Sequence, residues 1–182
     1  MKNLRGRRQE EFIELNKKFM KDTKSKEILI IILKGHLYIE NEIIGMLTET
    51  IIDEKIISQS TFRQKLELAH SMGIIENEYG VFGKVNTIRN KYAHNIDYEF
   101  TEKDYEDLIS TMPKVHKDEF LKDLEECKNI FYDNSIPEFN FKIQLLLNNI
   151  WFLASTCRLK GKEAIELRLK EKEIETLNKY VK

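Results

Sequence analysis

Three polar side chains near the middle of the chain have types and spacing suited to acid–base chemistry at a phosphate. They are Arg89, Asn90 and His94, in the stretch TIRNKYAHN (residues 87–95). Arginine binds phosphate oxygens through parallel N–H donors, and histidine can give and take protons near neutral pH. Asparagine can hold an imidazole in one tautomer or orient a substrate oxygen. The stretch therefore indicates a small site that handles a phosphate.

A helix is needed to bring these side chains together. Residues four apart stack on one helix face, so Asn90 lies almost beneath His94. Arg89 lies about 100° round the cylinder from Asn90, and its long side chain can reach the same rim. His94 also falls near the expected helix C-terminus, where the dipole favours a protonated ring able to act as a general acid. A polar helix end that simply faces water fits the same spacing, and the residues alone leave both interpretations open.

The rest of the sequence is typical of helices. Its seven Gly and two Pro are few for 182 residues, and apolar residues recur at spacings of three and four. We expect a loop around residues 53–59, a linker over 132–139 and no sheet. We expect helices over residues 7–20, 26–52, 60–73, 76–94, 101–112, 115–131, 139–159 and 162–181.

Several residues mark where these helices begin and end. Ser60 is a predicted N-cap and Gly73 a C-terminal stop. Asn95 can end a helix in a left-handed backbone conformation. Thr101 begins the next helix as a cap, with an acidic residue three positions later. Gly161 is expected to separate the last two helices.

The helical spacing also predicts which residues face the core. Gly35 and Gly45 each cost about 1 kcal/mol relative to Ala in a helix, so we expect them to permit close helix approach or to leave room for a ligand. The predicted core residues are Phe12, Leu15, Phe19, Ile32, Ile39, Ile43, Met46, Leu47, Phe62, Leu66, Ala69, Val81, Val85, Ile88, Phe139, Phe141, Trp151 and Phe152.

Composition excludes several classes of protein. The longest apolar run, Ile28 to Leu33, is far too short for a membrane span, and no signal peptide is recognisable. Two cysteines and four histidines show no metal-binding spacing, and no Gly-rich phosphate loop is present. We therefore expect a cytoplasmic protein without cofactor, metal or membrane partner. His36, His70 and His116 are expected at the core edge or on the surface.

Charge is uneven along a chain whose formal net charge is −1. Residues 1–26 carry nine basic and four acidic side chains, residues 97–133 five and twelve, and residues 141–182 nine and five. A broad phosphate-neutralising surface is thus excluded. The basic ends and the acidic middle could complement each other within the fold or across a dimer, or could be solvated helix faces.

The stretch IRNKYAHN is similar to the motif of the HEPN superfamily, an arginine followed by a histidine after four to six residues, with Asn, Asp or His often next to the arginine. The preceding LKGHLYIENEIIGML and FRQKLELAHSMGII also resemble the HEPN branch of mannitol-operon-repressor-like and phage-defence proteins. The resemblance covers residues 27–112. It implies an all-α, up-and-down helical bundle over residues 1–133 that forms a homodimer through the motif helices. Residues 134–182 would be a helical extension packed on the bundle or on a dimer partner.

The resemblance also implies an activity. Many HEPN proteins are metal-independent endoribonucleases of toxin–antitoxin or antiviral defence systems, in which the 2′-hydroxyl of RNA attacks the adjacent phosphate. His94 would be the acid–base residue, Arg89 would stabilise the phosphorane, and Asn90 would position one of them. An antitoxin or defence-system protein would be a further partner. The alternatives are a non-catalytic regulatory or scaffolding module and a nucleotide sensor.

Four more residues are candidates for supporting this site: Glu40, Asn41, Tyr92 and Tyr98. Glu40 and Asn41 are polar residues within an apolar helix, and they could face the motif helix or the solvent. HEPN toxins paired with nucleotidyltransferase antitoxins carry a tyrosine two residues after the histidine. Here that position is Ile96, and Tyr98 is the nearest tyrosine downstream.

Overall fold

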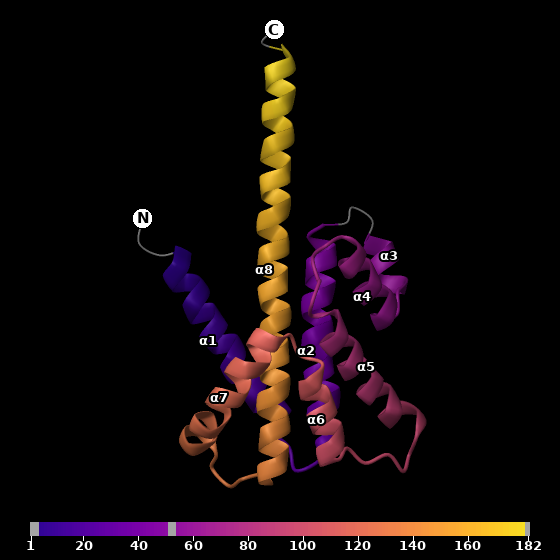
Figure 1. Cartoon of the computed structure of the whole chain (residues 1–182), viewed down its shortest axis with the longest axis vertical. Helices are drawn as coiled ribbons and strands as arrows, with labels where there is room; N and C mark the ends of the chain where they lie inside the picture. Colours follow the sequence, from indigo (N-terminus) through magenta and orange to yellow (C-terminus); the bar gives the residue numbers. More distant parts are fainter. Residues whose placement is uncertain (1–3, 51–53, 181–182) are drawn as a thin grey trace.

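The protein is an all-α helical bundle, as its sequence predicts (Figure 1). The computed structural model describes residues 4–50 and 54–180, and these residues form eight α-helices and no strand. None of the helices in this part of the chain combines the length and the apolar character of a membrane span. The helices are α1 (Leu4–Thr23), α2 (Ile28–Thr48), α3 (Glu54–Gln59), α4 (Phe62–Ser71), α5 (Tyr79–His94), α6 (Glu102–Ser110), α7 (Lys114–Phe131) and α8 (Glu138–Tyr180).

Helices α2 and α8 lie side by side through the middle of the molecule, and the others pack around them (Figure 1). Gly35 of α2 permits the close approach: a Cβ atom there would lie 2.8 Å from Cδ1 of Leu147 on α8. At Gly45 the guanidinium of Arg158 occupies the corresponding space, and its Nη2 lies 2.7 Å from Oε1 of Glu49. Close helix approach, rather than room for a ligand, therefore accounts for Gly35.

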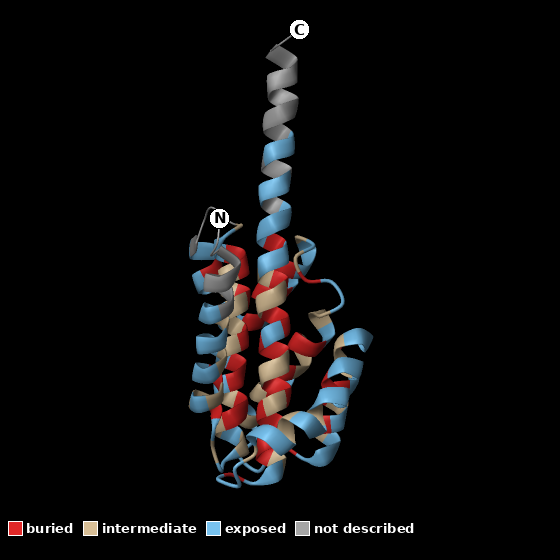
Figure 2. Cartoon of the chain, turned by 90° about the vertical axis from the view of Figure 1, so that its left-hand side faces the viewer, coloured by how far each residue is buried: buried red, intermediate tan, exposed pale blue. Residues whose placement is uncertain are grey.

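One continuous hydrophobic core joins α8 to the helices that precede it, and Figure 2 shows the buried faces turned toward one another. The predicted inward faces of α2, α4 and α5 are confirmed. Because α8 supplies a large part of the same core, residues 138–161 are integral to the bundle. The buried residues of α2 and α8 include Ile31, Ile32, Ile39, Ile43, Met46, Leu47, Phe141, Ile143, Leu146, Leu147, Ile150 and Trp151.

Two predicted core residues are instead exposed. Leu15 is 48% exposed and Phe152 is 45% exposed. On α1 the core contact is made by Phe12 and Phe19, whose rings stack on Trp151 at centroid distances of 5.7 and 5.4 Å. Leu15 lies about 60° round the helix from Phe12, and the Trp151 contact therefore leaves it outside.

Helix α8 does not break at Gly161, so the prediction of two C-terminal helices is wrong. The helix runs unbroken for 43 residues, about 65 Å at the usual rise per residue. Gly161 is buried, and a Cβ atom there would lie 2.8 Å from Cγ2 of Ile74. This glycine thus serves packing against the segment after α4. Beyond it, the last turns of α8 project away from the other helices (Figure 1).

Helix ends near the motif follow local capping. The N-cap of α4 is Thr61, not Ser60: its Oγ1 accepts a hydrogen bond from the backbone N–H of Gln64. Gly73 follows the end of α4 with a φ of 70°, as a C-terminal stop requires. Thr101 caps α6 as predicted.

Other boundaries differ from expectation. A short helix, α3, occupies much of the predicted loop before α4, and α5 begins at Tyr79 rather than near residue 76. Residues 51–52 and 181, which the predicted helices included, lie outside the described part of the chain. Asn95 ends α5 as expected, but its φ of −136° is extended, not left-handed.

Candidate active site at the end of α5

Helix α5 carries Arg89, Asn90 and His94 in its last turns. Its apolar face is held by burial of Val81, Phe82, Val85 and Ile88, and the helix packs against α2 and α4. Because this face is fixed in the core, the polar positions that follow it are brought to the bundle surface. The predicted site therefore lies at the end of a well-anchored helix.

The three motif residues have different environments. Arg89 and Asn90 are half-buried, whereas His94 is exposed in the last turn. Nη1 of Arg89 donates a hydrogen bond to Oδ1 of Asn90 at 3.1 Å. Asn90 and His94 share a helix face, but Arg89 and His94 are about 140° apart round the axis. One copy of the chain thus pairs Arg89 with Asn90, and no partner of the His94 imidazole is found among the described residues.

A polar network, built on the buried His36 and Lys65 and the half-buried Glu40 and Asn86, lies between α2, α4 and the face of α5 that precedes Arg89. Nε2 of His36 lies 3.3 Å from Oδ1 of Asn86, and Nδ1 of His36 lies 3.8 Å from Oε2 of Glu40. The other oxygen of Glu40 accepts a 2.8 Å hydrogen bond from Nζ of Lys65. Glu40, a predicted supporting residue, is thus linked to the motif helix through His36 and Asn86.

Burial is the main influence on the His36 imidazole. The residue is 3% exposed, and its ring contacts that of Phe62 at a centroid distance of 4.6 Å. Burial lowers the pKa of His36, and the charges of Arg89 and Lys65 lower it further. Glu40 and the Asn86 amide act in the opposite direction on this pKa without reversing the shift. His36 is therefore neutral at pH 7, and it lies close enough to Arg89 to be affected by its charge.

Asn41 does not join this network. It is exposed and lines a surface cavity on the α1 side of α2, with Lys18, Asp22 and Tyr38. One step along a helix turns a side chain by about 100°, so Asn41 and its neighbour Glu40 point to different sides of α2. The structure brings Glu40 to the motif helix and leaves Asn41 away from it.

Tyr92 and Tyr98 hold the segment that follows α5. Their ring centroids are 4.7 Å apart, and the hydroxyl of Tyr92 accepts a 3.3 Å hydrogen bond from the backbone N–H of Phe100. Lys91 lies 4.8 Å from the Tyr98 ring centroid and 3.1 Å from Oδ1 of Asp104. Burial raises the pKa of both phenols, so neither ionises near neutral pH. Their contacts position the chain after His94.

Sequence reasoning missed three members of the polar network: His36, Lys65 and Asn86. The spacing of two pairs of residues could have indicated His36 and Asn86. Asn86 precedes Arg89 by three residues, and His36 precedes Glu40 by four, which are the separations of residues on one helix face. The contact of Lys65 with Glu40 had no such signal, because it joins two separate helices.

No three His, Cys, Asp or Glu side chains of the described residues come together as metal ligands would. Comparisons with models of protein families, with curated proteins and with solved structures found no match. The fold and the site together define a class: an all-α bundle with an Arg–Asn–His set at the surface end of one anchored helix.

Proposed function

We propose that the protein is a metal-independent endoribonuclease of HEPN type, working as a homodimer in a toxin or antiviral defence role. The observation that carries the proposal is the Arg89–Asn90–His94 set at the end of α5. Its imidazole is exposed to a substrate, while its guanidinium is held by a hydrogen bond. The HEPN-like spacing of these residues supports the same function.

Each motif residue has a role in this chemistry. The 2′-oxygen of RNA forms a bond to the adjacent phosphorus and the bond from phosphorus to the 5′-oxygen breaks, leaving a cyclic phosphate and a 5′-hydroxyl. The proton lost by the 2′-hydroxyl passes to a base, and an acid protonates the leaving oxygen. His94 fills these proton-transfer roles, and Arg89 stabilises the negative charge on the phosphorane. Asn90 positions Arg89, in keeping with their hydrogen bond.

A dimer would bring the separated groups together. Because Arg89 and His94 point about 140° apart on one helix, the His94 ring of one copy and the Arg89 of another could act on one phosphate. Gly80, Gly83 and Thr87 are small residues on the same face of α5 as Asn90 and His94. Of these three, Gly80 and Thr87 are exposed and Gly83 is half-buried. Such residues permit close helix approach, which favours pairing of two motif helices.

The test is cleavage of total cellular RNA in EDTA. We expect wild type to cut, His94→Ala to lose activity, and the matched variant His116→Ala to retain it, because His116 lies on α7. Cut ends bearing a cyclic phosphate and a 5′-hydroxyl would identify the chemistry. Equal cleavage by wild type and His94→Ala, or no cleavage by folded, dimeric wild type, would contradict the proposal.

One observation favours a second function, a non-catalytic interaction module. The end of α8 projects from the bundle (Figure 1), and Leu167 on it is 59% exposed. Leu167, Ile174 and Val181 are spaced by sevens, as in a seam against a partner helix, although the side chain of Ile174 and all of Val181 lie outside the described part. Loss of partner binding without loss of RNA cleavage in a protein ending at residue 162 would separate the two functions.

A further inference from the structure

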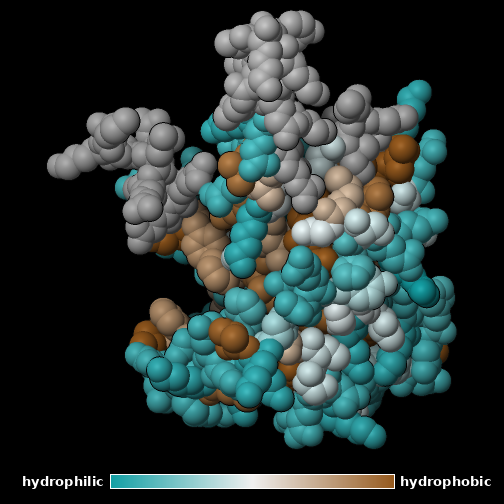
Figure 3. Space-filling view, turned by 45° about the horizontal axis from the view of Figure 1, so that its top comes forward, coloured by the Kyte–Doolittle hydropathy of each residue, from teal (hydrophilic) through white to brown (hydrophobic). Residues whose placement is uncertain are grey.

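Helix α7 contacts the bundle through few side chains. Its one buried residue is Phe120, while Ile130 and Phe131 near its end are 63% and 64% exposed. Figure 3 shows apolar side chains, in brown, interrupting the hydrophilic surface on the side of the molecule where α7 lies. Space therefore remains between α7, α1 and α8.

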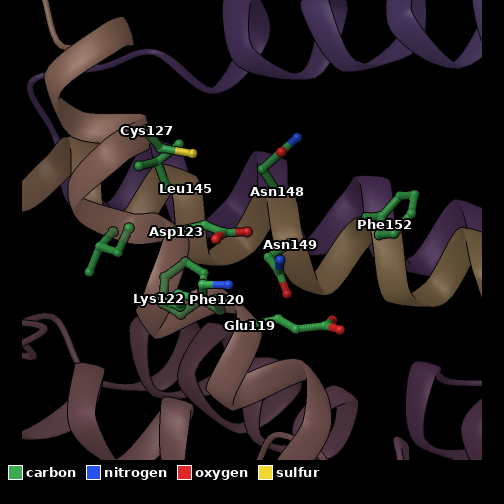
Figure 4. A pocket seen from close by; sticks show the side chains of 10 residues that line it. Glu119, Phe120, Lys122, Asp123, Cys127, Leu145, Asn148, Asn149 and Phe152 are labelled. Carbon is green, nitrogen blue, oxygen red and sulfur yellow. The ribbon is translucent and has the colours of Figure 1, made fainter.

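Two adjoining cavities occupy this space, which we call the α7 cleft. Their volumes are about 500 and 620 Å³, and both are lined by Cys127, Leu145 and Asn148. Figure 4 shows the smaller cavity, where Glu119 and Asp123 of α7 lie opposite the asparagines of α8. The larger cavity lies on the α1 side, and its volume is typical of pockets that bind small molecules.

The floor of the larger cavity is apolar. Met20 of α1 and Phe141 and Leu145 of α8 line it. Phe141 is 5% exposed and belongs to α8, the central helix of the bundle, so the floor is rigid. Phe131 lies at the mouth, where an apolar ligand would cover its exposed ring.

The rim of the larger cavity is basic. Lys17, Lys21 and Lys24 line it from one face of α1. Nζ of Lys17 lies 2.7 Å from Oε1 of Glu14, and Nζ of Lys24 lies 2.7 Å from Oδ2 of Asp133. Lys21 is the rim lysine for which no carboxylate partner is found among the described residues. Its charge is available to a bound anion.

Two hydrogen-bonding side chains of α8 line the cleft: Gln144 lines the larger cavity, and Asn148 lines both cavities. Gln144 is 1% exposed, and its Nε2 donates to the backbone oxygen of Met20 and to Oγ1 of Thr23. Nδ2 of Asn148 is buried without a partner among the described residues, which is uncommon for a buried donor. Rotation of this amide about its terminal torsion would present its NH₂ to an acceptor in either cavity.

We infer that the α7 cleft binds a small anionic amphiphile: an aliphatic or aromatic body carrying one carboxylate or phosphate group. The body lies on Phe141 and Leu145, and the anionic group lies at Lys21. The smaller cavity is lined by two carboxylates, Glu119 and Asp123, against one cation, Lys122. This excess of negative charge disfavours the opposite orientation of the anionic group. The inference does not rest on the ribonuclease proposal, since no residue of the cleft belongs to α5.

The test is calorimetric titration of the full chain with ligands that share one alkyl chain, each below its micelle concentration. Dodecanoate and dodecyl phosphate carry the anionic group, and dodecanol lacks it. We expect saturable binding of one or both anions, at least about fivefold tighter than dodecanol. Tighter binding of dodecanoate assigns the cleft to carboxylic acids, and tighter binding of dodecyl phosphate assigns it to phosphate monoesters.

Matched variants then place the site. Lys21→Glu should weaken anion binding by about five- to tenfold, whereas Lys18→Glu, on another face of α1, should leave it unchanged. Phe131→Ala should weaken it by about tenfold. All three residues are exposed, so the variants keep the fold. Bound ligand should also slow alkylation of Cys127, with the buried Cys157 as the internal reference.

Three results would each overturn the inference. The first is no saturable binding of either anion, and the second is dodecanol binding as tightly as dodecanoate. The third is equal affinity of Lys21→Glu and Lys18→Glu for the bound anion, which would show that the ligand lies elsewhere.

Discussion

Helix α5 carries two polar groups that differ in their surroundings. Near its middle, Asn86 contacts His36, which belongs to a polar network with Glu40 and Lys65. At its end, Arg89 and Asn90 are half-buried and His94 is exposed. A buried polar side chain must be satisfied by its neighbours, and its loss destabilises the fold. An exposed polar side chain is hydrogen-bonded to water instead of to neighbouring residues. It can therefore bind a substrate without loss of contacts that stabilise the fold.

Breaking the Glu40–Lys65 pair should have the largest effect on stability. The side chains of Lys65 and Glu40 are 10% and 21% exposed, so Glu40→Ala leaves an ammonium group buried without its counter-ion. We expect the free energy of unfolding to fall by about 3 kcal/mol, measured by urea denaturation.

The double variant Glu40→Leu/Lys65→Met is the matched control, because it removes both charges together. Its free energy of unfolding should return to within about 1 kcal/mol of wild type. A double variant as unstable as Glu40→Ala would show that packing, not the uncompensated charge, is responsible.

The His36 imidazole should make stability depend on pH. Its pKa is lowered in the folded protein, so the unfolded chain binds the proton first as pH falls below its ordinary value of about 6.5. Above about pH 6.5 the imidazole is neutral in both states and does not change the free energy of unfolding. Below that pH, proton binding by the unfolded chain lowers the free energy of unfolding progressively. We expect a loss of about 1 kcal/mol between about pH 7.5 and 5.5 by urea denaturation.

His36→Gln should remove this part of the pH dependence, because glutamine does not titrate. His116→Gln, on α7, should keep it. An unchanged pH profile in His36→Gln would assign the effect to other groups and contradict the role of His36.

His94→Ala should have the smallest effect on stability. The side chain is exposed, so we expect a change within about 0.5 kcal/mol in the free energy of unfolding. Loss of RNA cleavage with unchanged stability would show that His94 acts on the substrate, whereas the network around Asn86 stabilises the fold. A loss above about 2 kcal/mol would instead place His94 among the residues that hold the fold.

Much of the local structure follows from short patterns in the sequence. The three- and four-residue spacing of Val81, Val85 and Ile88 predicted both α5 and its buried face, which the structure confirms. The Thr101 cap and the Gly73 stop were also predicted, because capping depends on residues within one turn. The Arg89–Asn90–His94 set was visible for the same reason.

Errors arose where a local signal competed with packing. Gly161 was expected to end a helix, since glycine weakens helices. In the structure its missing side chain makes room for Ile74, and α8 continues. Leu15 fits the spacing of an inward stripe, but its place outside the core depends on where Trp151 lies.

The sequence by itself determined the helical class, the inward faces of the central helices and the composition of the motif turn, because each depends on residues a few positions apart. Only the tertiary structure decided which distant side chains meet. Glu40 and Lys65, or Lys24 and Asp133, are brought together by the packing of whole helices. The polar network behind the motif and the cleft under α7 both arise from this packing, which no single stretch of sequence contains.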